Sequence, residues 1–196
     1  MRIALTGTPG TGKTAVASEL RRLGFHVVDL NGFAKKHGLI GRRDRVRRTR
    51  EVDLGRMGRL IGQELPSNTT VFLEGHVAHL IDVDYAVVLR CTPAVLRRRL
   101  AVRNYPASKV RENSLAEALD AITAEAVARL GRRRVIEMDT TRRKAASVAG
   151  DLARLARRGF SGVSALRPGA IDWTNDIIRN ADYYSRCEPQ KRRPGR

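Results

Sequence analysis

A glycine-rich stretch near the start of the chain has the composition of a phosphate-binding loop. Residues 7–14 read GTPGTGKT and match the pattern G-x-x-x-x-G-K-[S/T] in full, between an apolar run and a helical pattern. Glycines let the backbone N–H groups turn inward toward phosphate oxygens, and the following helix adds its positive end. Lys13 is then expected to bridge the β- and γ-phosphates of a nucleoside triphosphate, and the Thr14 hydroxyl to bind Mg²⁺.

A second polar element follows a predicted buried strand. The segment VFLEGH places Glu74 at the strand end and His76 two residues later. A carboxylate at this place can reach Mg²⁺ or its waters, so Glu74 is a candidate metal ligand beside Thr14. His76 is a candidate for positioning an attacking water or for contacting phosphates. The alternatives are a solvated strand-end carboxylate and an ordinary loop histidine.

Phosphoryl transfer also needs cations over the charge that develops on the phosphates. In the segment PAVLRRRLAVRNYPASK, Arg99 and Arg103 are four residues apart and therefore share one face of a helix. Arg103 stands where this helix runs into a loop, which makes it the candidate catalytic arginine of a lid over about 103–113. The sequence contains no N-K-x-D segment of the kind that reads guanine, which argues against a GTPase.

Alternating strands and helices must position these residues. Apolar runs predict five strands, and helical spacing predicts helices between them, with Thr92 and Pro93 starting one and a capping box of Ser114 and Glu117 starting another. The strands are expected over 2–6, 25–30, 70–75, 85–91 and 133–139, and the last helix over 142–158. This order predicts an α/β fold with a doubly wound parallel five-stranded sheet.

Length and composition limit the number of domains, the cellular location and the kind of partner that we expect. The 196 residues fit one domain, and no apolar run is long enough to span a membrane, so we expect an intracellular, cytoplasmic protein. Cys91 is expected to be a small buried residue, and Cys187 lies in a polar tail. The net charge of +18, mostly from arginine, indicates either a polyanionic partner such as RNA or an arginine-biased surface.

Several motifs together resemble those of the adenylate kinase isoenzyme 6 family, the archaeal and nuclear type of adenylate kinase. The resemblance covers about residues 1–158 and is carried by LTGTPGTGKT, by LEGH and by the string VLR…RL..RNY…K…EN…AE. It implies a P-loop kinase fold, ATP and Mg²⁺ as cofactors, and the reaction ATP + AMP ⇌ 2 ADP with additional ATPase activity. It also implies binding to a small-subunit ribosomal protein during rRNA processing.

The resemblance also assigns positions. The ATP-phosphate loop corresponds to Gly10, Gly12, Lys13, Thr14 and Ala15, the lid arginine to Arg103, and the Walker B-like acid and histidine to Glu74 and His76. The nucleoside-monophosphate-binding segment corresponds to about residues 29–53. The kinase domain is then expected over 1–159, and residues 160–196 are expected to form a C-terminal extension with a basic, flexible tail.

The chain departs from the family pattern at three places. Glu74 replaces the usual aspartate, Ala15 replaces a common second threonine, and the loop at 41–50, often acidic in relatives, reads GRRDRVRRTR. A nucleoside-monophosphate kinase is the main hypothesis. The alternatives are a ribosome-assembly ATPase with little kinase role and a P-loop kinase for another small metabolite.

Overall fold

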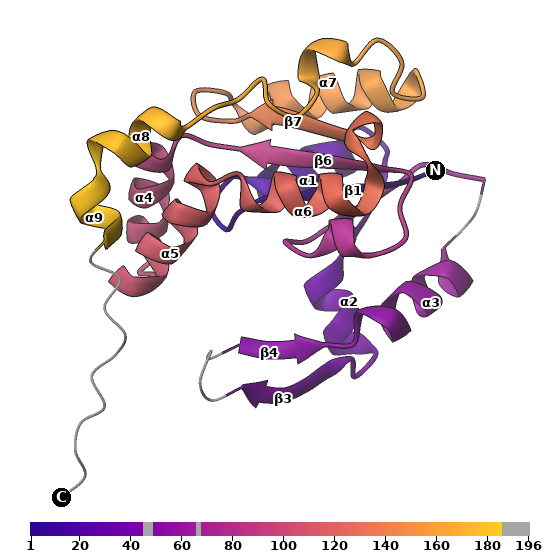
Figure 1. Ribbon diagram of the computed structural model, residues 1–196. Helices are drawn as coiled ribbons and strands as arrows, with labels where there is room; N and C mark the ends of the chain where they lie inside the picture. The colour runs from indigo at the N-terminus through magenta and orange to yellow at the C-terminus, as the bar shows by residue number, and fades with distance from the viewer. Residues whose placement is uncertain (45–48, 66–67, 186–196) are drawn as a thin grey trace, which may run out of the picture.

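A parallel sheet forms the centre of the molecule. The structure, a computed structural model, describes residues 1–44, 49–65 and 68–185, with only the backbone described at 42–44 and 49–51. The five strands are β1 (Arg2–Thr6), β2 (His26–Asp29), β5 (Val71–Glu74), β6 (Tyr85–Arg90) and β7 (Val135–Asp139). They are all parallel, in the order β2-β5-β1-β6-β7 (Figure 1), which confirms the predicted sheet.

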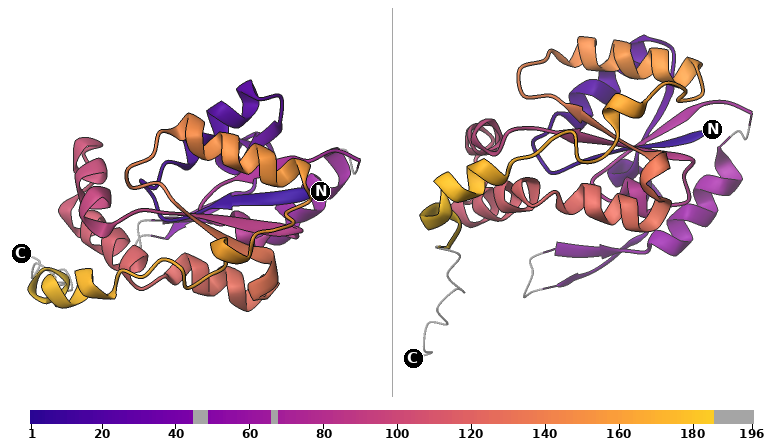
Figure 2. Two further views of the ribbon diagram at one scale, coloured as in Figure 1. Left: turned by 90° about the horizontal axis from the view of Figure 1, so that it is seen from above. Right: turned by 45° about the horizontal axis from the view of Figure 1, so that its top comes forward.

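Helices cover both faces of this sheet, as Figures 1 and 2 show. One face packs against α1 (Lys13–Arg22) and α7 (Ala145–Arg157), and the other against α2 (Leu30–Lys36), α3 (Leu54–Glu64) and α6 (Ala121–Leu130). Strand β1 shows why: Ile3 and Leu5 enter the first core and Ala4 enters the second, because neighbouring side chains of a strand point to opposite faces. Both faces of the strand are therefore buried, as its apolar run predicts.

The segment between α2 and α3 is a hairpin that projects away from the sheet (Figure 1). Strands β3 (Ile40–Asp44) and β4 (Thr49–Val52) pair antiparallel. The expectation of an arginine-rich loop was therefore wrong for the described backbone, because antiparallel pairing uses backbone donors and acceptors and does not exclude arginine. The arginine side chains at 42–50 lie outside the described residues.

The predicted helix start at Ser114 was wrong. Ser114 lies inside α5 (Ala107–Ala118), where its hydroxyl donates to the Val110 carbonyl at 2.6 Å instead of capping a helix end. Asp120, with a φ of 55°, separates α5 from α6. Two other boundaries differ slightly, because residues 132–134 form a 3-10 turn before β7 and the last helix of the domain begins only at Ala145.

Much of the C-terminal extension is folded onto the domain. Phe160 and Val163 are buried in the core under α7, and α8 (Thr174–Arg179) and α9 (Ala181–Ser185) lie along α4 (Pro93–Val102) and α5 in Figure 1. Arg97 of α4 donates to Asp176 and to the Tyr184 hydroxyl, which fixes this arrangement. The basic end of the tail and Cys187 lie outside the described residues. Cys91 is fully buried, as expected.

Candidate active site

The phosphate-binding loop connects β1 to α1 at the carboxyl edge of the sheet. Its glycines are required by the backbone, since Gly7 and Gly10 have φ values of 136° and 93°. A Cβ atom on Gly7 would lie 2.4 Å from the Leu89 carbonyl oxygen, and one on Gly10 would lie 2.8 Å from a Leu96 methyl. The loop is therefore closely packed on β6 and α4.

Lys13 is held inside this loop. Its ammonium donates to the carbonyls of Gly7 at 2.6 Å and Thr8 at 3.0 Å. Burial lowers the pKa of Lys13 to about 8, although the charges of Glu74 and Glu117 favour the ammonium. A triphosphate could replace these two carbonyls with phosphate oxygens as the partners of the Lys13 ammonium.

Thr14 and Glu74 lie side by side next to the loop, and each carries an oxygen atom that could bind a metal ion. The Thr14 hydroxyl donates to the Glu74 carboxylate at 3.4 Å, and burial, followed by the neighbouring Asp29, raises the pKa of Glu74 above its ordinary value. Within the described ranges no three His, Cys, Asp or Glu residues cluster as a complete metal site. Mg²⁺ in kinase sites needs only one or two such protein oxygens, because substrate phosphates and waters complete its shell. Thr14 and Glu74 fit that role.

A polar cavity of about 200 Å³ brings the predicted catalytic residues together. It is lined by Lys13, Thr14, Glu74, His76 and Arg103, which come from three different segments of the chain. Sequence analysis did not single out the two other polar side chains that line it, Asn31 of α2 and Tyr105 after α4. Partial desolvation, followed by the Lys13 charge, lowers the pKa of His76, so its imidazole is neutral at pH 7.

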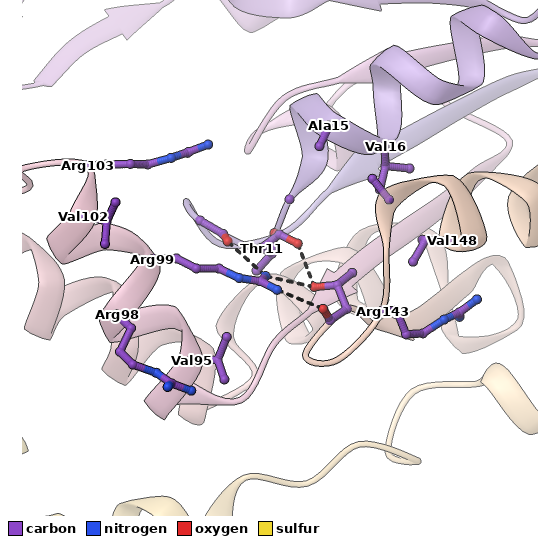
Figure 3. Close-up of a pocket in the computed structure, with 14 residues that line it drawn as sticks. Thr11, Ala15, Val16, Val95, Arg98, Arg99, Val102, Arg103, Arg143 and Val148 are labelled. Atoms are coloured by element: carbon purple, nitrogen blue, oxygen red, sulfur yellow. Dashed lines mark hydrogen bonds between the residues drawn. The ribbon is translucent and has the colours of Figure 1, made fainter.

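A larger cavity of about 620 Å³ adjoins the first one. Figure 3 shows its wall of small apolar side chains, which come from α1, α4 and α7, with arginines at the rim. These apolar residues are Ala15, Val16, Val95, Val102, Ala145 and Val148. Four residues line both cavities, namely Gly10, Gly12, Ala15 and Arg103. An apolar cavity next to a phosphate loop suits a nucleoside, because the flat faces of its base can pack against apolar side chains.

Arg99 supports this larger cavity rather than projecting into solvent. Its guanidinium donates to the Gly10 carbonyl at 3.4 Å and to the Thr140 carbonyl at 3.0 Å (Figure 3). It also donates to the Thr141 carbonyl at 3.4 Å. It therefore ties the phosphate loop to the segment after β7. Sequence analysis placed Arg99 and Arg103 on one helical face but could not show this anchoring.

A buried charged network behind the loop was missed altogether. Arg90, at the end of β6, is 1% exposed and pairs with Glu117, Asp120 and Glu137. Glu117 also accepts a hydrogen bond from the Thr8 hydroxyl at 2.6 Å. The available signal was an arginine inside the apolar run AVVLRC, since arginine is rarely buried without partners.

The predicted acceptor segment lies on the other side of the loop. Asp29 and Asp53 cap α2 and α3 by accepting hydrogen bonds from Asn31 N at 2.9 Å and Arg56 N at 2.8 Å. At the base of the hairpin, a cavity of about 340 Å³ is lined by residues 38–41, Val52, Asp53 and Arg56.

None of the helices within the described ranges is long and apolar enough to cross a membrane.

Sequence comparisons show which known proteins this chain resembles. Residues 3–120 match the AAA domain family. The protein named "Putative adenylate kinase" of Methanocaldococcus jannaschii is 36% identical over 175 residues, which are 89% of this chain and 93% of that protein. The protein of the same name in Archaeoglobus fulgidus is 38% identical over 186 residues, which are 95% and 99% of the two chains.

Solved structures with the same fold include P-loop kinases. Shikimate kinase from Acinetobacter baumannii, in complex with shikimate, has a TM-score of 0.54 at 19% identity, over 81% of this chain and 93% of that one. TT1252 from Thermus thermophilus has a TM-score of 0.55 at 20% identity, over 80% and 97%. These identities show the fold alone. From the relatives and the fold together, the chain is a P-loop phosphotransferase that belongs to the archaeal family named putative adenylate kinase.

Proposed function

We propose that the protein is a nucleoside-monophosphate kinase that transfers the γ-phosphoryl group of ATP to AMP. The observation that carries the proposal is the pair of adjoining cavities that share Gly10, Gly12, Ala15 and Arg103. The larger, apolar cavity suits the donor nucleoside, and the smaller, polar one suits the phosphoryl group in transit. The relatives named adenylate kinase support AMP as the acceptor.

The residues of the polar cavity have the chemistry that this transfer needs. Lys13 and the backbone N–H groups of the loop would hold the β- and γ-phosphates, while Arg103 would reach the transferring group from the opposite side. Thr14 and Glu74 would hold Mg²⁺, which when bound supplies positive charge to the phosphate oxygens. Positioning and charge compensation are then the main contributions of the protein.

The acceptor would approach from the side of α2 and the hairpin. Asn31 and His76 line the polar cavity there, and a neutral imidazole can accept or donate one hydrogen bond without adding a charge. Residues 103–113 would act as a lid that closes over both nucleotides and excludes water.

A coupled assay of ADP formation tests the proposal with AMP, CMP, GMP, UMP and water as acceptors. We expect AMP to raise ADP formation well above the rate of ATP hydrolysis alone, with two ADP formed per AMP consumed. An equal rate with and without AMP would refute AMP as the acceptor. Stimulation by another nucleoside monophosphate would keep the kinase and change its substrate.

A second proposal is an ATPase that acts in small ribosomal subunit assembly. The net charge of +18 supports it, because such a surface favours binding to rRNA or to a pre-ribosomal particle. Co-sedimentation with small-subunit precursors should then depend on the bound nucleotide. Binding to any RNA, with a steep salt dependence and no nucleotide effect, would contradict this role.

A further inference from the structure

Glu117 connects the phosphate loop to α5, the helix that contains residues 107–113 of the predicted lid. It lies in the last turn of α5 and is 2% exposed. One carboxylate oxygen accepts the Thr8 hydroxyl at 2.6 Å, and the other accepts Arg90 Nε at 2.8 Å and the Cys91 backbone N–H at 3.1 Å. Both oxygens are thus used, one toward the loop and one toward the end of β6.

A carboxylate so near a phosphate site needs compensation. An unpaired buried negative charge is costly in itself and would also repel a triphosphate. Arg90 supplies the compensation, since its guanidinium donates to the side chain and, at 3.0 Å, to the backbone carbonyl of Glu117. The paired carboxylate can therefore contact the loop without opposing nucleotide binding through a free charge.

Thr8 is the residue through which this contact acts. A threonine hydroxyl has one proton, and here it is donated to Glu117, which fixes the side chain. The carbonyl of the same residue accepts the Thr11 hydroxyl at 2.9 Å, the Thr11 N–H at 3.2 Å and the Lys13 ammonium at 3.0 Å. A change in the position of Thr8 would therefore move several parts of the loop at once.

We propose that Glu117 is a positioning residue that holds the phosphate loop in its binding conformation through the Thr8 hydroxyl, and so couples the loop to α5. The proposal rests on the proposed function, because the loop is taken to bind ATP. Its new content is that a side chain outside the loop, on the helix that also forms much of the predicted lid, sets the geometry of the loop.

The test compares Thr8→Val with Thr8→Ser in the full chain. Thr8→Val keeps the shape of the side chain, removes the hydroxyl and leaves the Glu117–Arg90 pair intact. We expect it to weaken Mg·ADP binding, measured by calorimetry, by about tenfold, because a hydrogen bond to a charged group is lost. Thr8→Ser, which retains the hydroxyl, should restore binding. Wild-type affinity in Thr8→Val, or no rescue in Thr8→Ser, would overturn the proposal.

Glu117→Gln supplies the second arm. A glutamine amide has one acceptor oxygen. If that oxygen accepts from Arg90 and the Cys91 N–H, the amide NH2 group faces Thr8, and Thr8 can no longer donate its hydroxyl proton to residue 117. We expect weaker Mg·ADP binding here too, with Thr8→Val adding little in the double variant because the two act through one contact. Fully additive losses would contradict the coupling.

Glu137→Gln is the matched control. Glu137 also pairs with Arg90, but its other hydrogen bonds are to Thr123 and to the Gly169 N–H, and neither residue belongs to the phosphate loop. It should lower the melting temperature and leave Mg·ADP affinity within about twofold of the wild type. Equal loss of affinity in this variant would reduce the role of Glu117 to general stability and overturn the proposal. All arms measure nucleotide binding alone, so a failure of AMP phosphorylation would refute the proposed function without affecting this test.

Discussion

The two sides of the candidate site are held in place by different interactions. On the donor side, buried polar contacts tie the phosphate loop to its surroundings, with Lys13, Arg99 and Glu117 each bonded to loop atoms. On the acceptor side, α2, the β3–β4 hairpin and α3 attach to the sheet mainly through an apolar cluster that includes Met57 and Ile61.

This difference indicates which half is preformed. Buried hydrogen bonds to charged groups are directional and costly to break, so they hold one geometry. Apolar packing is less directional and leaves more freedom for a segment to shift as a unit. We therefore expect the backbone of the phosphate loop to keep its position when nucleotide binds and the acceptor half to adjust when AMP enters.

Lys13→Ala should have the largest effect on the donor half. Removal of the ammonium takes away the charge that faces the β- and γ-phosphates, and we expect kcat to fall about 10²–10³-fold. The coupled assay of ADP formation measures it. Arg22→Ala, at the exposed end of the same helix, is the control and should retain full activity. A kcat within threefold of the wild type in Lys13→Ala would remove this residue from the mechanism.

Arg90→Met tests whether the buried network stabilises the donor half. It leaves Glu117 and Glu137 buried without their cation, so the free energy of unfolding should fall by about 3–5 kcal/mol. Urea denaturation followed by circular dichroism measures the change. Arg154→Met, which removes an exposed partner of Asp151, should change it by less than about 0.5 kcal/mol. Similar values for the two variants would refute the importance of the network.

The pH dependence of ATP binding should reveal the lowered pKa of Lys13. Below about pH 8 the buried amine is charged and can hold phosphate, and above it the proton is lost. We therefore expect the affinity of the free enzyme for ATP to fall about fivefold between pH 8 and pH 9, where an ordinary lysine with a pKa near 10.4 would stay charged. The Lys13→Met variant should lack this fall. Its persistence in the variant would assign the effect to another group.

Among these substitutions, Asn31→Ala should have the smallest effect, and the effect should be confined to the acceptor half. Asn31 lines the polar cavity from α2, so its loss should raise the KM for AMP about three- to tenfold, as expected for one hydrogen bond. The KM for ATP is the internal control and should not change. An equal rise in both constants would show that the two halves are not separate.

Much of the site could be predicted from the sequence because its parts are local. The loop pattern, the buried strands and the strand-end position of Glu74 each depend on a few neighbouring residues. The hairpin was missed, since arginines obscured the alternation that marks a strand. Glu117 was misassigned to a helix cap, because its partner Thr8 is 109 residues away and nothing in a local window indicates that contact.

The sequence by itself determined the phosphate loop, since glycines at fixed positions and a following helix start are enough to specify the backbone. Only the tertiary structure decided which side chains meet that loop. Parallel strands bring Glu74 to the same sheet edge as the loop, and packing of α4 and α5 brings Arg103 and Glu117 to its two sides. Packing also buries Lys13 and thereby lowers its pKa. Such effects depend on desolvation and on contacts between distant segments, which exist only after the chain has folded.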